Sequence, residues 1–93
     1  MEKSTRQIMA ESNQIGVQFL LADLATGITF LNVAEVTQIA ATRERNYGSA
    51  WTAYRTVLRL LPRVTPTVEQ QAELTAKITE LKRRLTAAGF ETE

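Results

Sequence analysis

The sequence predicts an all-α protein, a three-helix antiparallel bundle. Apolar residues recur at alternating steps of three and four along three segments, the period of a helix buried on one side, and no segment alternates as a half-buried strand does. The segments are separated by short polar stretches, and short connections make neighbouring helices antiparallel. A chain of 93 residues is large enough for one core only, so we expect a single helical domain over residues 1–93.

The first helix is expected over residues 12–43, after a flexible amino-terminal segment of about residues 1–7. Its main apolar stripe comprises Val17, Leu21, Leu24, Ile28 and Leu31. Further apolar residues lie beside this stripe, so most sides of the helix should be covered. Gly27 either allows a neighbouring helix to approach one long helix or marks a break between two shorter ones. We expect one helix, because no proline accompanies the glycine and the apolar spacing resumes at Ile28 without a shift.

The second helix is expected over residues 48–62. Residues 46–49, at the end of the polar run 42–46, should supply the turn and the cap, and Pro62 should end the helix because proline has no amide hydrogen for the helical ladder. The apolar face of this helix comprises Tyr47, Ala50, Tyr54, Val57, Leu61 and Val64. Trp51 and Leu58 widen that face. We therefore expect Trp51 and Tyr54 to pack in the core or at its rim.

The third helix is expected over residues 66–88. It begins either at Thr65 and Pro66 or at a capping box formed by Thr67 and Gln70, and Gly89 is a helix stop signal. Residues 89–93 are expected to form a frayed carboxyl-terminal tail. Because the first helix is longer than the others, apolar surface should remain uncovered at one end. Ile8 and Met9 could fold back over that surface, or a second copy of the chain could cover it.

The composition argues against enzymatic chemistry. The chain has no cysteine and no histidine, which removes thiolate catalysis, thiolate metal sites and the commonest acid-base group at neutral pH. Asp23 and Glu35 are about 18 Å apart along one helix, too far for an acid-base pair. Asp23 is expected to contact an arginine or a neighbouring helix end. We therefore expect a non-enzymatic protein with no catalytic residue, no cofactor and no metal site.

The amino-terminal sequence lacks the apolar core of a secretory signal, so a cytoplasmic location is the default expectation. Residues 15–36 are apolar at fourteen of twenty-two positions and long enough to cross a bilayer. However, Asp23 and Glu35 lie within this segment, and each carboxylate would cost about 2.5 to 3.5 kcal/mol near the bilayer centre. We expect a buried helix of a soluble protein and no membrane span.

Residues 46–62 carry a resemblance to a known family. Asn46 and Tyr47, then Ala50 and Tyr54, then Pro62 resemble the second half of a tetratricopeptide repeat. The first half departs from that repeat. A single hairpin of this kind closed by a third helix is also similar to the microtubule-interacting and trafficking domain, a three-helix bundle that binds short amphipathic helices. The resemblance implies a peptide groove on the outer surfaces of the second and third helices, and no individual binding residue is carried over.

One basic stripe is the remaining candidate site. Arg55, Arg59 and Arg63 recur every four residues, and Arg43 and Arg45 lie in the preceding polar run. These side chains could bind phosphates, or they could be a solvated face that pairs in part with Glu35, Glu69 or Glu73. The net charge of +1 gives no global reason to expect nucleic acid.

We expect a protein-interaction module that acts by self-association, as a homo-oligomer, or by docking a helical partner. The alternative is a binder of nucleic acid or acidic surfaces through the arginines.

Overall fold

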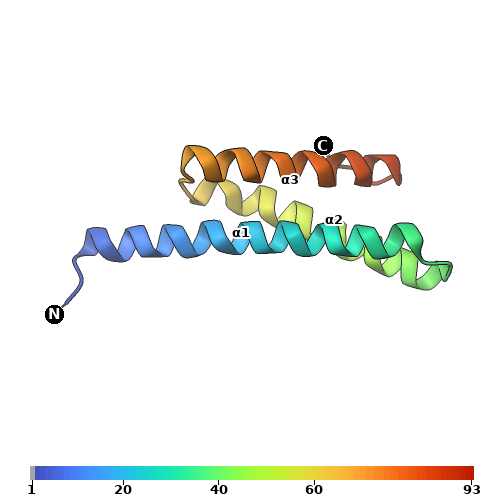
Figure 1. Ribbon diagram of the computed structural model, residues 1–93, viewed down its shortest axis with the longest axis horizontal. Coiled ribbons are helices and arrows are strands. Elements are labelled where there is room, and N and C mark those ends of the chain that lie inside the picture. Colours follow the sequence, from blue (N-terminus) through green and yellow to red (C-terminus); the bar gives the residue numbers. More distant parts are fainter. Residues whose placement is uncertain (1) are drawn as a thin grey trace.

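Three helices run up, down and up along one long axis, as a computed structural model of the chain shows (Figure 1). The structure describes residues 2–93. Its helices are α1 (Thr5–Val36), α2 (Ala40–Leu60) and α3 (Val68–Ala87), and a short 3-10 turn, η1 (Leu61–Arg63), follows α2. No strand occurs among the described residues. The prediction of an all-α, three-helix antiparallel bundle is therefore confirmed, although several helix boundaries differ from those expected.

Helix α1 begins earlier than the sequence pattern indicated. Ser4 and Gln7 form a reciprocal capping box: the Ser4 hydroxyl accepts from the Gln7 amide at 3.2 Å, and the Gln7 side chain accepts from the Ser4 amide at 2.9 Å. The expectation of a flexible segment over residues 1–7 is thus wrong from Ser4 onward, and Met1 lies outside the described residues. The amino-terminal turns of α1 extend beyond α2 and α3 (Figure 1).

The turn between α1 and α2 lies at residues 37–39, not at residues 46–49. Thr37 is extended, its hydroxyl accepts from the Ile39 amide at 3.3 Å, and the Arg43 guanidinium donates to the Thr37 carbonyl at 3.0 Å. The expected boundaries of 12–43 and 48–62 are therefore wrong at this connection. The polar run continues as the first turns of α2 because arginine and glutamate are good helix formers.

The last two connections follow the sequence signals closely. Pro62 lies in the 3-10 turn that ends the second helical segment, and the Thr67 and Gln70 capping box begins α3. Gly89 has a φ of 93°, a left-handed conformation that glycine adopts without steric penalty. The amides of Gly89 and Phe90 donate to the carbonyls of Thr86 and Leu85, both at 3.0 Å, which completes a Schellman motif.

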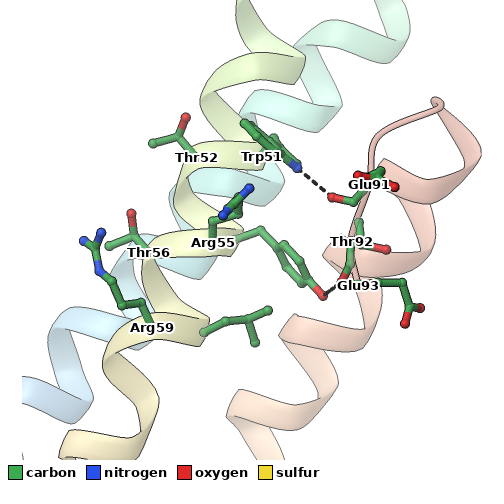
Figure 2. Close-up of a pocket in the computed structure, with 10 residues that line it drawn as sticks. Trp51, Thr52, Arg55, Thr56, Arg59, Glu91, Thr92 and Glu93 are labelled. Atoms are coloured by element: carbon green, nitrogen blue, oxygen red, sulfur yellow. Dashed lines mark hydrogen bonds between the residues drawn. The ribbon is translucent and has the colours of Figure 1, made fainter.

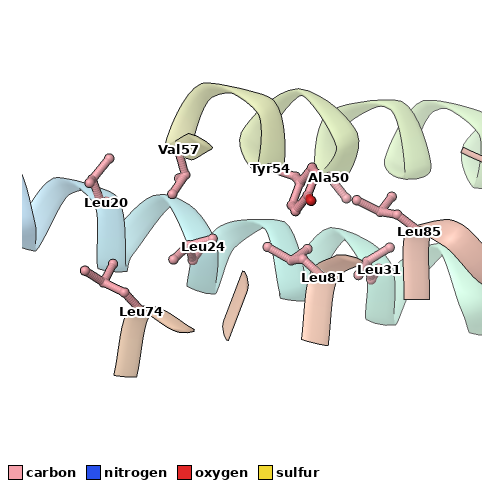
Figure 3. Packing of buried hydrophobic residues seen from close by; sticks show 9 residues of the cluster. All are labelled: Leu20, Leu24, Leu31, Ala50, Tyr54, Val57, Leu74, Leu81 and Leu85. Atoms are coloured by element: carbon pink, nitrogen blue, oxygen red, sulfur yellow. The ribbon is translucent and has the colours of Figure 1, made fainter. Parts of the chain in front are cut away.

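Figure 3 shows the core, to which each helix contributes three side chains. The cluster comprises Leu20, Leu24, Leu31, Ala50, Tyr54, Val57, Leu74, Leu81 and Leu85. On α1 the fully buried line passes through Leu20 and Gly27, while Leu21 and Ile28 are only partly buried. The buried face therefore differs from the expected stripe by one residue at two positions, with Leu20 in place of Leu21 and Gly27 in place of Ile28. The reason is that α2 and α3 both pack on one side of α1, and its buried face is centred between them.

Gly27 lies where all three helices meet. A β-carbon built on it would lie 3.3 Å from Cδ2 of Leu81 on α3 and 3.4 Å from Cβ of Ala53 on α2. Helix α1 passes through this position without a break. The prediction of a single helix with close approach at Gly27 is confirmed. A second close approach, at Gly16, was not predicted: a β-carbon there would lie 2.8 Å from Cγ1 of Val64.

The carboxyl-terminal residues pack against α2, so the expectation of a frayed tail at residues 89–93 is wrong. The Phe90 ring lies 5.9 Å from the Tyr47 ring and 6.1 Å from the Trp51 ring. Trp51 Nε1 donates to the Glu91 carbonyl at 2.8 Å, and the Tyr54 hydroxyl donates to the Thr92 carbonyl at 3.0 Å. Hydrogen bonds and ring contacts thus hold this segment in place.

One ion-pair network joins α1 to α3. Arg84 donates to both carboxylate oxygens of Glu35, at 3.0 and 2.6 Å, and to the Asn32 side chain at 2.8 Å. Glu80 lies 3.5 Å from the same guanidinium. The hydrogen bond from Arg84 lowers the pKa of Glu35 below its ordinary value, against a smaller opposing effect of burial.

This network predicts a pH-dependent contribution to stability. Because the folded-state pKa of Glu35 lies below that of the unfolded chain, the carboxylate stabilises the fold at neutral pH, and this contribution is lost as the pH falls through the folded-state value. We expect Glu35→Gln to lower the free energy of unfolding at about pH 7 and to differ less from the parent at about pH 3. Denaturant melts at the two pH values measure this. Glu73→Gln is the control, since Glu73 makes no ion pair within residues 2–93; an equal effect of both variants would contradict the assignment.

Candidate interaction surfaces

The predicted arginine stripe is exposed, but its five members do not form one surface. Arg55, Arg59 and Arg63 are exposed along the second half of α2 and the following turn. Arg43 lies about 18 Å from Arg55 along the helix axis and about 120° away around it. Its guanidinium is held at the connection between α1 and α2. The structure therefore brings Arg55 and Arg59 together along one groove. Arg63 borders a different hollow, beside Ile8 and Val64, and Arg43 is separate from all three.

None of these five arginines makes an ion pair with the part of the chain that the structure describes. The expected pairing with Glu35, Glu69 or Glu73 is wrong, since Glu35 is paired with Arg84 instead. Asp23 is half-buried and also has no hydrogen bond or ion pair within residues 2–93, so its expected polar partner is not found. Burial raises the pKa of Asp23 above its ordinary value.

A shallow groove of about 590 Å³ lies between α2 and the carboxyl-terminal segment (Figure 2). The Arg55 guanidinium lies over the Trp51 ring, 4.9 Å from its centroid, and Arg59 lines the same wall. Glu91 and Glu93 line the groove from the other side. The Glu93 carboxylate also lies 3.8 Å from Nζ of Lys82 on α3. Two arginines and two glutamates therefore line the groove, so their formal charges cancel and give it no net positive charge.

A second surface runs along the side of α1 that faces away from α2 and α3. We call it the outer stripe; it comprises Ile8, Ser12, Ile15, Phe19, Ala22, Thr26, Thr29, Val33 and Val36. All nine residues are exposed and none is charged. The relative exposure is 70% for Ile15, 52% for Phe19 and 79% for Val36. At about 1.5 Å per residue the stripe is about 42 Å long, which makes it an extended apolar surface on a small protein.

Two of the hydroxyl groups on the outer stripe, those of Thr26 and Thr29, form hydrogen bonds within the protein and do not need water as a partner. Thr26 Oγ1 donates to the Ala22 carbonyl at 2.9 Å, and Thr29 Oγ1 donates to the Ala25 carbonyl at 3.2 Å. Each threonine hydroxyl is therefore satisfied within α1 itself. Covering these two residues would leave no donor unpaired, and the cost of burying them is correspondingly small.

The sequence contained a signal for this surface. Ile8, Ile15, Ala22, Thr29 and Val36 recur at intervals of seven, and the other members of the stripe lie four residues after the first four of them. This is the 4-3 spacing of a heptad repeat. Sequence reasoning recognised apolar residues on more than one side of the helix and expected them to be covered. The structure leaves this side open, and Ile8 and Met9 remain exposed instead of folding back.

Comparisons of the chain with protein-family models, with curated proteins and with solved structures found no match. The likeness to tetratricopeptide repeats and to microtubule-interacting and trafficking domains stays a prediction. Ala50 and Tyr54, which carry part of that likeness, are buried, and Tyr47 is partly buried. Core positions of this kind are required of any amphipathic helix in a bundle.

The structure also bears on metal binding and on membrane crossing. Within residues 2–93 no group of three or more acidic, histidine or cysteine side chains could hold a metal ion. Helix α1 is long and apolar enough to cross a bilayer by length and composition alone, with 33% of its most apolar window buried. Core helices of soluble proteins satisfy the same criterion, and the inner side of α1 is packed against α2 and α3. The outer stripe and the groove are the two surfaces on which function can be argued.

Proposed function

We propose that this chain is a non-enzymatic, helical protein-interaction module whose contact surface is the outer stripe of α1. The supporting observation is the stripe itself: nine exposed, uncharged residues in unbroken heptad spacing. Covering apolar surface is favourable by about 25 cal/mol per Å². A partner of helical shape fits best, because the spacing averages 3.5 residues and matches the seam along which two helices pack.

Photo-crosslinking from the stripe tests this proposal. A photoreactive phenylalanine analogue replaces Phe19, whose ring is half exposed, in the cells that make the protein. We expect covalent adducts with a polypeptide, and we expect Ile15→Glu, one turn away on the same stripe, to reduce them by about tenfold because a carboxylate would be buried in the contact.

The matched control places the same analogue at Val68, an exposed apolar residue at the start of α3 that lies outside the stripe. This control should give few adducts. Equal yields from the two positions, or adducts from position 19 that persist in Ile15→Glu, would show that the outer stripe is not a contact surface.

The arginines support a second candidate function, the binding of nucleic acid or another polyanion. The observation in favour is that Arg55 and Arg59 line one groove beside Trp51 and make no ion pair within residues 2–93. If each of these arginines contacts one phosphate, the double variant Arg55→Gln, Arg59→Gln should bind a single-stranded oligonucleotide with a weaker salt dependence. The slope of log affinity against log salt concentration should become shallower by about 1.4. Arg43→Gln is the control. Binding that is absent, or equally salt-dependent in all variants, would exclude this candidate.

A further inference from the structure

We infer that the outer stripe docks a second copy of this chain, with the two α1 helices antiparallel and Phe19 of each packed against Ala22 of the other. This inference rests on the proposed function and specifies the partner. It is carried by three properties of the stripe: its register, its pairing of large with small residues, and the charges beside it.

The register follows from the helix itself. When two identical helices pair antiparallel, the residue numbers of the two members of each opposed pair add up to the same value along the whole contact. A sum of 41 opposes every stripe residue except Val36 to another stripe residue, and it pairs Ile8 with Val33, Ser12 with Thr29, Ile15 with Thr26 and Phe19 with Ala22. The same sum opposes Thr5 to Val36, which are the first and last residues of α1. The full length of both helices is therefore paired, with neither end overhanging the other.

Size complementarity distinguishes this register from its neighbours. The bulkiest side chain of the stripe, Phe19, meets the smallest, Ala22, and Ile15 meets the shorter Thr26. Large residues packed against small ones fill space without forcing strained side-chain conformations. Sliding one helix by seven residues in either direction leaves a heptad of each helix unpaired. In one of these directions it also opposes Phe19 to Ile15, two large side chains.

Charge also favours an antiparallel second copy. The acidic residues Glu11 and Asp23 flank the stripe on opposite sides, and in an antiparallel pair each side faces the same side of the other copy. Their nearest counterparts there are Asn32 and Gly16, so no carboxylate is directly opposed to another. Antiparallel helices additionally align their macrodipoles favourably. A membrane surface is a poorer occupant, because helices that lie on membranes are rich in basic residues and α1 contains only Arg6.

The available area indicates a dimer of modest affinity. Helix α1 has 32 residues and is therefore about 48 Å long, and a helix with its side chains is about 10 to 12 Å wide. Two such faces cover roughly 1,000 Å² in total, at the lower limit for a specific interface. We expect a dimer that dissociates on dilution.

The mass in solution, measured by light scattering over a range of protein concentrations, is the first test. The parent chain should approach twice its monomer mass as concentration rises, and Ala22→Lys should raise the dissociation constant by about a hundredfold by placing an unpaired charge at the centre of the contact. The control is Ala76→Lys on the exposed side of α3, which should dimerise like the parent. Circular dichroism should be unchanged in both variants, since both alanines are exposed.

The orientation is tested by disulfide crosslinking, since the chain has no cysteine of its own. Ser12→Cys and Thr29→Cys are opposed in the proposed register, where they can bridge only between a copy carrying one and a copy carrying the other. A mixture of the two variants should crosslink, and each variant alone should not. Crosslinking of each variant with itself would indicate a parallel pair and overturn the inference.

Two further outcomes would also overturn it. A monomeric mass at every concentration, together with photo-adducts from position 19 to a different polypeptide, would refute the second copy and retain the proposed function. A monomeric mass with sedimentation on phosphatidylcholine and phosphatidylserine vesicles that Ala22→Lys abolishes would show that lipid covers the stripe. The absence of both dimer and adducts would refute the inference and the proposed function together.

Discussion

Replacing Tyr54 with alanine should lower the free energy of unfolding by about 3 to 5 kcal/mol, the usual cost of truncating a core aromatic residue. Tyr54 is 3% exposed and belongs to the core cluster, on the side that borders the carboxyl-terminal segment (Figure 3). The substitution also removes the hydroxyl that donates to the Thr92 carbonyl. Denaturant melts at a fixed protein concentration measure the change, and the emission of Trp51, the single tryptophan, reports the transition.

Tyr54→Phe separates the two contributions. It keeps the buried ring and removes only the hydrogen bond to Thr92, so it should cost about 0.5 to 1.5 kcal/mol. If Tyr54→Ala changed the stability by less than about 0.5 kcal/mol, the ring would not be a core residue. If both variants cost the same, the hydrogen bond and not the burial of the ring would account for the loss.

The parts of the fold that could be predicted have local signals. The capping box at Thr67, the proline in the turn after α2 and the glycine after α3 each fix the backbone through their own side chain or their lack of one. The turn at residues 37–39 has only a weak local signal, since it contains no glycine or proline, Ile39 provides no side-chain cap, and the Thr37 hydroxyl alone bonds the backbone there. Tertiary packing must set the position of this turn, and packing cannot be read from neighbouring residues.

The choice between two faces of α1 illustrates the same limit. The line through Val17 and Leu20 and the line through Phe19 and Ala22 both have the spacing of an amphipathic helix, and they lie about 160° apart around the axis. Periodicity predicts that each face packs against something. Only the position of α2 and α3 determines which face forms the core and which remains open.

The candidate site was predictable in part for a related reason. The arginines were recognised because their charge and spacing are visible in the sequence, and their exposure in the structure agrees with that interpretation. The groove beside Arg55 could not be predicted, because its other wall is formed by the carboxyl-terminal residues. Those residues are too few to show a periodic pattern. A local signal was present, however, because the residue that directly follows a helix-ending glycine often makes an apolar contact, and here that residue is Phe90.

Substituting Gly27 with leucine should also have a large effect, a loss of about 1 to 3 kcal/mol or more, because extra carbon atoms would be forced into a packed core. At Gly27 even a single β-carbon would be 3.3 Å from the Leu81 side chain and 3.4 Å from Ala53. Any larger side chain must push α1 away from both neighbouring helices. Thermal or denaturant melts at one protein concentration measure the loss.

Gly48→Ala is the matched control for this prediction, because Gly48 also lies within a helix but a β-carbon there would have no atom within 4 Å. That variant should instead gain about 0.5 to 1 kcal/mol from the higher helix propensity of alanine. Opposite signs at the two glycines would locate the cost of Gly27→Leu in the contact between the three helices. A stabilising or neutral Gly27→Leu would mean that the helices do not approach one another at this residue as closely as the structure has them.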